Sequence, residues 1–332
     1  MAGENGILIV AETGADGSLG SITNELMSAA QGLSADLGEP ISAALIGSGV
    51  GDRAQDIIDL GADTVYLVDG EQFANYLNET YTPAVIAIAQ QANPRIILIG
   101  HTPNGRDLGP YLAVRLQTGI ASDTSGLSIE GGQLQAARSV AGGLFRQVVS
   151  FPKMPAIATV HMKAYDGAEP QSGRSGNVVN VDVGLDASSV RSRFVKHEDA
   201  QVEGIRMEDA TIVVTGGRGM GDEAGFNELY KLQALLPQSA VGATRAATDS
   251  GFCEQDLMIG ITGRVVSPDV YFAIALSGAS QHMAGCSGSK NIVAINRDPE
   301  ANIFSESRFG VVGDYKQVLP ALIEEVEKLM QG

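Results

Sequence analysis

The chain has 332 residues, of which 44% are hydrophobic, so it can form about two domains with sizeable cores. Its net charge of −17 argues against binding to nucleic acids or to anionic membranes, because both need a basic surface. Two cysteines form neither a disulfide framework nor a four-cysteine zinc site, and no apolar run is long enough to span a membrane, so we predict a cytoplasmic protein.

The first hundred residues alternate short apolar runs with segments of helical periodicity. The apolar runs predict strands at residues 7–12, 41–47, 64–69 and 95–100. The other segments predict helices at residues 21–36, 52–60, 76–92 and 106–117. Strands that alternate with helices indicate a mostly parallel sheet with helices on both faces.

From about residue 123 the helical segments stop, and polar residues alternate with apolar ones around Gly131-Gly132 and Gly142-Gly143. This pattern predicts antiparallel strands joined by hairpins, followed by strands at residues 155–162 and 177–183. The charged stretch at residues 196–209 is typical of a connector between domains. We therefore expect one domain at residues 1–200 and a second at 207–332.

The second domain returns to alternating strands and helices. The predicted strands cover residues 211–215, 270–276 and 291–296, with another ending at 314, and the predicted helices cover residues 223–236 and 314–330. The whole chain is thus expected to have an α/β fold with two domains, each built on a mostly parallel sheet with flanking helices.

Ligands of such sheets bind outside the carboxyl ends of the strands, and three loops of the second domain lie there. The first, TGGRGMG at residues 215–221, places Arg218 among glycines. A guanidinium group suits a phosphate, and glycines let the backbone approach it. The glycine spacing is not that of the dinucleotide-binding fingerprint, so a tight turn explains the loop equally well.

The second loop, SGASQH, follows a buried strand at the point where a helix would begin. Its free backbone N–H groups could hold an anion, although Ser277 or Ser280 could instead cap the helix. His282 offers one donor and one acceptor when neutral and two donors when protonated, and a buried structural histidine is the alternative.

The third loop region joins Thr244 and Arg245 to the turn at residues 260–263, in which Thr262 presents a hydroxyl between two glycines. Further along the chain, Asn296 and Asp314 end strands. Their side chains suit ribose hydroxyls or adenine edges, or serve as turn residues.

Side-chain catalysis is not indicated by any motif. The four histidines lack metal-binding spacing, and neither a nucleophile elbow nor a phosphate-binding P-loop motif occurs. The three loops together favour the binding of an anionic dinucleotide, with no metal ligand and no catalytic side chain. A nicotinamide-dependent dehydrogenase and a redox-inactive nucleotide sensor or scaffold are the alternatives.

Four segments in this order resemble the alpha subunit of electron transfer flavoproteins. They are VGATRAATDSGF, TGRVVSPDVYFAIALSGASQHMAG, NIVAINRDPEANIF and GVVGD, and the match runs from about residue 214 to 320. The first 200 residues fit the amino-terminal domain of that family more loosely. The resemblance implies that residues 207–332 form a Rossmann-like FAD-binding domain.

The same resemblance implies roles for individual residues. Arg218 would contact the pyrophosphate or adenosine side of FAD, and the turn at residues 277–280 would hold the phosphate and ribityl groups. Thr244, Arg245, Thr262 and His282 would surround the isoalloxazine ring, and Asn296 and Asp314 would contact the AMP half. The full implied set is Arg218, Thr244, Arg245, Ile259, Gly260, Ile261, Thr262, Ser277, Gly278, Ala279, Ser280, Gln281, His282, Asn296, Asp314 and Tyr315.

The sequence departs from the family at one point near the flavin. Relatives have the sequence QVGQTG where this chain has MIGITG, so Met258 and Ile261 replace two glutamines. Glutamine can donate and accept hydrogen bonds, whereas methionine and isoleucine offer no N–H or O–H donor. We therefore expect fewer polar contacts at the flavin ring.

A partner subunit also follows from the resemblance. The family forms a heterodimer with a beta subunit, which carries AMP or a second FAD and which the amino-terminal domain contacts. FAD would accept electrons from partner dehydrogenases and pass them to a downstream acceptor, with electron bifurcation where a second flavin is present. The chain is then an electron carrier rather than an enzyme that converts a substrate.

Overall fold

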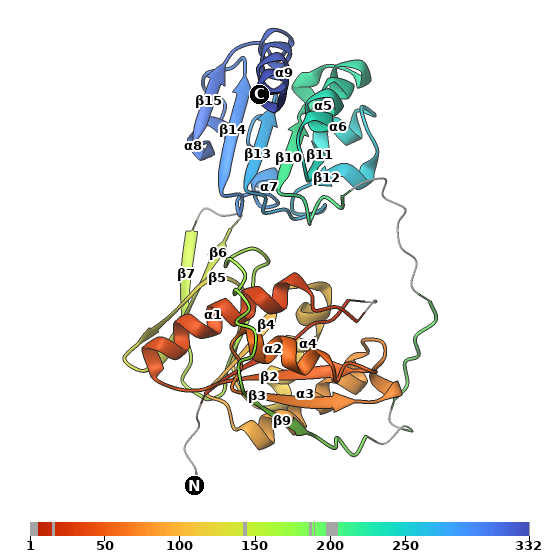
Figure 1. The fold of residues 1–332 in the computed structure, drawn as a ribbon. Coiled ribbons are helices and arrows are strands. Elements are labelled where there is room, and N and C mark those ends of the chain that lie inside the picture. Colours follow the sequence, from red (N-terminus) through yellow and green to blue (C-terminus); the bar gives the residue numbers. More distant parts are fainter. Residues whose placement is uncertain are drawn as a thin grey trace. The chain divides into compact units, whose positions relative to one another are not determined.

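The computed structural model describes residues 6–14, 17–141, 145–185, 188, 190–196 and 205–331. The Gly142-Gly143 pair and most of the predicted connector lie outside these residues. The chain forms two compact units, each with its own sheet (Figure 1). Unit 1 comprises Met1–Val140 and Arg146–His197, and unit 2 comprises Ala141–Phe145 and Glu198–Gly332.

The sheet of unit 1 has the strand order β7-β6-β5-β8-β4-β1-β2-β3-β9. Strands β5 and β6 pair antiparallel, whereas β1, β2, β3, β4, β8 and β9 pair parallel with their neighbours. The strands span Ile7–Val10, Ile41–Gly47, Thr64–Asp69, Ile96–Gly100, Ile120–Glu130, Gln133–Val140, Phe145–Ser150, Ala156–Val160 and Asn177–Asn180, from β1 to β9.

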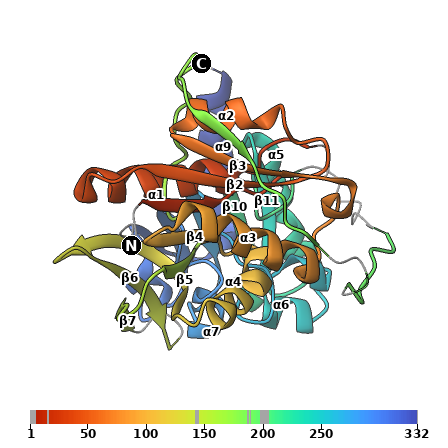
Figure 2. The same cartoon turned by 90° about the horizontal axis from the view of Figure 1, so that it is seen from below.

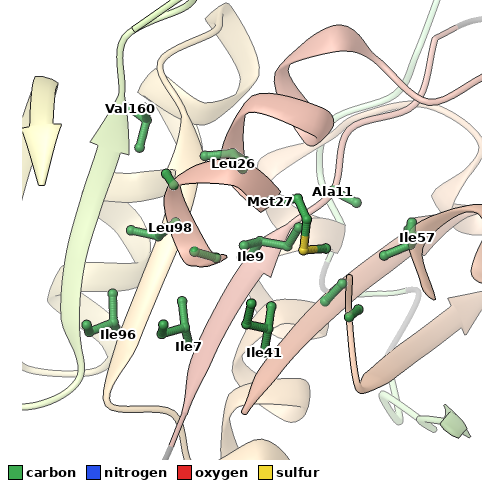
Figure 3. Packing of buried hydrophobic residues seen from close by; sticks show 14 of the residues in the cluster. Ile7, Ile9, Ala11, Leu26, Met27, Ile41, Ile57, Ile96, Leu98 and Val160 are labelled. Atoms are coloured by element: carbon green, nitrogen blue, oxygen red, sulfur yellow. The ribbon is translucent and has the colours of Figure 1, made fainter. Parts of the chain in front are cut away.

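Helices cover both faces of this sheet because its central strands are apolar on both sides. Helices α1 (Ser21–Leu37) and α2 (Arg53–Leu60) pack on one face with alternate residues of β1 such as Ile7 and Ile9. Figure 3 shows Ile9 beside Met27 of α1, and Ile7 and Leu26 belong to the same cluster. Helices α3 (Asn78–Ala92) and α4 (Pro103–Arg115) lie together on the other face (Figure 2).

The predicted hairpin region of unit 1 is only partly antiparallel. The β5–β6 pair confirms the hairpin, since Glu130 pairs with Gln133 across the glycine turn. However, β5 also pairs parallel with β8, and a register shift lies between Ala121 and Thr124. Strand β9 adds to the far edge of the sheet by parallel pairing with β3.

The six-stranded sheet of unit 2 has the order β12-β11-β10-β13-β14-β15, and all its described pairs are parallel. Numbered from the first strand of the unit, this is the order 3-2-1-4-5-6 of dinucleotide-binding folds. The strands span Ile212–Gly216, Ser239–Thr244, Met258–Ile259, Val270–Ile274, Asn291–Asn296 and Phe309–Val312, from β10 to β15.

Two long helices cover one face of this sheet, α5 (Glu223–Leu235) and α9 (Tyr315–Gln331). The other helices are short: α6 (Arg245–Asp249), α7 (Ser280–Met283) and α8 (Ile303–Glu306). Strands β11 and β12 lie on one side of β10, and strands β13, β14 and β15 lie on the other. The loops after β10 and β13 therefore lead in opposite directions and leave a crevice between them. The predicted α/β class with two mostly parallel sheets is confirmed.

Candidate functional site

A cavity of about 910 Å³ lies at the carboxyl ends of β10 and β13 in unit 2. Its position is the one at which the strand order reverses, where doubly wound sheets bind their ligands. Its size falls in the upper part of the range for ligand pockets. It is lined by residues Arg218, Gly219, Thr244, Arg245, Ala246, Asp249, Met258, Ile259, Gly260, Ile261, Thr262, Ala275, Leu276, Ser277, Gly278, Ala279, Gln281, His282, Asn296, Arg297, Asp298 and Ala301.

Most of the residues predicted from the sequence are brought together in this cavity. The exceptions are Ser280, Asp314 and Tyr315, which do not line it. Tyr315 is buried, and its hydroxyl donates a hydrogen bond to the carbonyl oxygen of Met220 at 2.5 Å. Asp314 accepts from the amide of Lys316 at 3.0 Å, as expected for a residue that precedes a helix.

The sequence reasoning missed Asp249, Arg297 and Asp298 among the polar lining residues. A signal for two of them was present, because Arg297 and Asp298 directly follow the strand that ends at Asn296. Asp249 stands four residues after Arg245, which places it on the same side of a helix.

The loop after β13 contains five consecutive backbone amides at residues 277–281, and four of these residues, all except Ser280, line the cavity. Within the described chain, the N–H groups of residues 277–281 donate no hydrogen bond to another residue. Helix α7 has only four residues, so its dipole adds little, and the donors themselves are the feature that suits an anion. The loop after β13 is therefore a candidate anion site through its backbone donors.

Gly278 holds this loop in place for a reason that the sequence did not reveal. Its φ of 76° is in the left-handed region, and a Cβ atom would collide with the backbone of Ile303. The carbonyl of Ser277 also accepts from the amide of Ile303 at 3.0 Å. A bulky side chain at Gly278 would thus disrupt the loop itself, whether or not a ligand is bound.

The glycines after β10 likewise serve the contact between two loops. The amide of Gly217 donates to Ile274 at 2.9 Å, and that of Gly219 donates to Ala275 at 3.1 Å. A Cβ at Gly219 would lie 2.6 Å from the Ala275 carbonyl oxygen. These glycines allow the two loops to pack closely, and Arg218 between them lines the cavity.

Asn296 connects strand β14 to the same loop. Its side-chain Nδ2 donates to the carbonyl of Leu276 at 2.8 Å, and its Oδ1 accepts from the amide of Asp298 at 3.0 Å. Both hydrogen bonds fix the backbone at the rim of the cavity. The side chain therefore acts as a support for the loops.

Three arginines and two aspartates, Asp249 and Asp298, line the cavity, so its lining carries a net charge of +1 in a chain whose net charge is −17. Among the described residues, the guanidinium groups of Arg218 and Arg297 form no ion pair. Arg245 pairs with Asp249, with 3.3 Å between Nε and Oδ2. Two of the three charges are therefore unpaired and available to an anion, and the third is shared with a carboxylate.

His282 lines the cavity, but both its ring nitrogens bond to the protein. Nδ1 lies 3.0 Å from the carbonyl oxygen of Ile259, which can only accept, so Nδ1 carries the proton. Nε2 then accepts from the hydroxyl of Tyr271 at 2.8 Å. Burial lowers the pKa of His282 to about 4. The ring is therefore neutral, and the protonated form considered from the sequence is disfavoured.

The turn in which Met258 and Ile261 stand, in place of the glutamines that the resemblance implies, lines the cavity. Ile261 is 62% exposed, so it does not point into the core. Its amide donates to the carbonyl of Gln281 at 2.9 Å, which joins this turn to the loop after β13. The hydroxyl of Thr244 accepts from the amide of Ala247 and caps α6, whereas Thr262 is exposed at the cavity.

Comparison with known proteins gives the family. The Electron transfer flavoprotein domain matches residues 7–186, and the Electron transfer flavoprotein FAD-binding domain matches residues 206–287. The chain belongs to the electron transfer flavoprotein alpha subunit family. The resemblance noted from the four sequence segments is thereby confirmed, and the FAD-binding match covers the loops after β10, β11, β12 and β13.

Relatives in this family align over nearly the whole chain. The electron transfer flavoprotein subunit alpha of Bacillus subtilis is 40% identical over 95% of both chains, and that of Thermoanaerobacterium thermosaccharolyticum is 39% identical over 95% of this chain and 96% of its own. The lactate dehydrogenase (NAD(+),ferredoxin) subunit LctC of Acetobacterium woodii is 31% identical over 94% of this chain and 75% of its own.

The described residues meet the requirements of neither a metal site nor a membrane-spanning helix. Within the described residues, no cluster of three or more His, Cys, Asp or Glu side chains could hold a metal ion, and His197 lies outside them. In the same part of the chain, no helix combines the length and the apolar character needed to cross a bilayer.

Proposed function

We propose that the chain holds FAD in the unit 2 cavity and acts as the electron-carrying alpha subunit of a heterodimeric electron transfer flavoprotein. The observation that carries this proposal is the run of five free amides at residues 277–281 beside the unpaired Arg218 and Arg297. A pyrophosphate needs such a set of N–H donors and charges, and a dinucleotide needs a cavity of this size.

The lining residues fit FAD in two parts. Arg218, Arg297 and the amides of residues 277–281 would hold the pyrophosphate, and the turn at residues 259–262 with Thr244 and Arg245 would surround the ring. Bound FAD would supply one-electron and two-electron redox chemistry. The chain would orient FAD, and Arg245 would stabilise negative charge near the ring. His282 would pack as a neutral ring, since burial keeps its pKa low.

The partner and the electron path are part of the same proposal. We infer that residues 1–200 form a domain that contacts a beta subunit, and that residues 207–332 form the FAD-binding domain. The beta subunit would carry AMP or a second FAD. Electrons would come from partner dehydrogenases and leave to a downstream acceptor, and a second flavin would permit bifurcation. The similarity to LctC supports this last option.

Purification of the alpha–beta complex tests the proposal. We expect a yellow complex that bleaches with dithionite and releases FAD on denaturation. The double variant Arg218→Gln, Arg297→Gln should lose most of its FAD, because it removes both unpaired charges from the cavity. The matched control, Arg308→Gln, changes an exposed arginine outside the cavity and should retain FAD. A colourless wild-type complex, or full FAD content in the double variant, would contradict the proposal.

A further inference from the structure

Unit 1 contains a second cavity at the equivalent point of its own sheet. In the order β3-β2-β1-β4, strands β2 and β3 lie on one side of β1 and strand β4 lies on the other. Strands β10 and β13 form the equivalent point of the sheet in unit 2. A cavity of about 330 Å³ lies at the carboxyl ends of β1 and β4. It has about a third of the volume of the FAD cavity, which suits one nucleoside-sized group rather than a dinucleotide.

The floor and walls of this cavity are apolar and aromatic. Aliphatic side chains from the ends of β1, β2 and β4 and from α4 form the floor, and Tyr76, Tyr81 and Phe194 supply rings. The Tyr81 hydroxyl is occupied, since it lies 3.1 Å from the carbonyl oxygen of Phe73. Such a surface suits a flat heteroaromatic ring. The aliphatic lining residues are Val10, Ala11, Ile46, Ile99 and Leu108.

The charge of this cavity is opposite to that of the FAD site. None of its described lining residues is Lys, Arg or His, and Glu12 is the one ionisable carboxyl among them. Burial raises the pKa of Glu12, so the cavity already disfavours negative charge. A phosphate there would have no cation to pair with and would lie beside a carboxyl group.

The amino terminus of α4, which could otherwise attract a phosphate, is already capped. Thr102 accepts a hydrogen bond from the amide of Gly105 at 3.1 Å and donates one to Oε1 of Glu12 at 2.7 Å. Glu12 thus occupies the position at the helix start that an anion would take. The Glu12 carboxyl group can still accept a hydrogen bond from an N–H donor of a ligand. Asn75 and Asn104 also line the cavity, and their side-chain amides can donate and accept hydrogen bonds.

We propose that the unit 1 cavity binds an uncharged nucleoside, with its base against the apolar floor and an amino group donating to Glu12. The proposal does not depend on FAD binding in unit 2, because the two cavities share no residue. The cavity should prefer a nucleoside to a nucleotide, because its volume suits one base and one sugar and its carboxyl group, with no cation among the described lining residues, disfavours a phosphate.

Calorimetric titration of the FAD-loaded alpha–beta complex at pH 8 with adenosine and with AMP tests this proposal. Ala74→Trp fills the cavity from an exposed position, so the binding lost in this variant belongs to unit 1 and not to a nucleotide site elsewhere in the complex. We expect adenosine to bind at least about tenfold more tightly than AMP to the site that Ala74→Trp removes.

Glu12→Gln tests the chemistry of recognition in the same titration. We expect adenosine to bind about tenfold more weakly, because a hydrogen bond to a charged acceptor is lost, and we expect the preference over AMP to shrink. Retained FAD absorbance and an unchanged melting temperature would show that each variant is folded. The proposal is overturned if adenosine binding is unaffected by Ala74→Trp, if it is undetectable at millimolar adenosine, or if AMP binds this site as tightly.

Discussion

At the scale of single residues, the charge near the proposed flavin depends on how Arg245 is paired. Its guanidinium lies 3.3 Å from Asp249, and both side chains are more than half exposed. Exposed pairs of this kind interact by about 0.2–1 kcal/mol. Asp249 therefore offsets part of the positive charge of Arg245.

Asp249→Asn should therefore raise the first reduction potential of bound FAD. Asp249→Asn removes the repulsion between the carboxylate and reduced flavin, and an exposed charge interaction of about 0.2–1 kcal/mol corresponds to about 10–40 mV for one electron. Arg245→Ala should lower the potential, because it removes the positive charge that stabilises reduced flavin. Spectroelectrochemical titration of both variants measures these shifts. Equal potentials in the two variants and the wild type would show that neither charge acts on the flavin.

The buried pair of His282 and Tyr271 predicts a dependence of stability on pH. The pKa of His282 is lowered to about 4 in the folded chain, below its ordinary value of 6.5, so the unfolded chain binds the proton more readily. Its contribution to stability is complete above about pH 6.5 and is lost as the pH falls towards 4. At pH 5 the loss is about 2 kcal/mol.

Urea unfolding of the complex at pH 7 and pH 5 measures this effect. The wild type should lose more stability between the two values than His282→Gln does, by about 2 kcal/mol, since the variant has no group to titrate at this position. Glu12 and other carboxyl groups titrate in both proteins, so only the difference reports on His282. An identical pH dependence in the two proteins would refute a buried neutral histidine.

Ile261→Gln tests the departure from the family at the flavin. Since Ile261 is 62% exposed and lines the cavity, the amide would reach ligand or solvent and would not be buried without a partner. We expect a rise of some tens of millivolts in the first reduction potential, from a hydrogen bond to reduced flavin, with little change in melting temperature. Val265→Gln, at a 43% exposed position outside the cavity, is the control. A large loss of stability without a shift in potential would defeat this interpretation.

At the scale of elements, the loop after β13 is expected to bind through its backbone. Ala279 has φ −58° and ψ 141°, which proline can adopt, so Ala279→Pro removes one free amide with little strain at this residue. FAD affinity should fall by about tenfold, the equivalent of one hydrogen bond to a charged group.

Two variants separate this effect from a general disturbance of the loop. Ser280→Ala removes a hydroxyl that does not line the cavity, and it should leave FAD affinity unchanged. The melting temperature of the FAD-free complex should be similar in both variants. Unaltered FAD affinity in Ala279→Pro would show that the amide of residue 279 does not contact the phosphates.

Local patterns were sufficient to predict most elements of the fold. Strands β2, β3 and β14 have the predicted bounds, and helix α1 differs by one residue, because apolar runs and helical periodicity are properties of neighbouring residues. The pairing of β9 with β3 was not predictable in this way. It joins Asn177 to Thr64, and nothing within either segment specifies a partner so distant in sequence.

The candidate site likewise combines features that a local sequence segment predicts with contacts between distant segments that it does not. Strand-end loops and the family motifs predicted most of its lining, because each is a continuous segment. The contacts between loops required coordinates: Gly278 packs on Ile303, Asn296 bonds to Leu276, and Tyr271 bonds to His282. A tyrosine in an otherwise apolar strand was the one visible sign that a buried polar partner exists.

At the scale of the whole molecule, the two units have separate interiors. Each sheet has an apolar cluster on both faces, and no cluster contains residues from both units among those described. The cavity proposed to hold FAD is lined entirely by residues of unit 2, between Arg218 and Ala301. Ligand binding stabilises the structure that forms the site, so FAD should protect unit 2 and leave unit 1 largely unaffected.

Hydrogen exchange of the alpha–beta complex with and without FAD tests this independence. At free FAD about 100 times its Kd, unit 2 gains about 2.7 kcal/mol, so amides in β10, β11 and β13 that exchange through unfolding should slow about 100-fold. Amides in β1, β2 and β4 serve as the internal control, because their cores share no residue with the cavity. Their rates should change less than about threefold. Equal protection of both sets of strands would mean that the two units unfold together, and the stabilisation could then not be assigned to the FAD-binding unit alone.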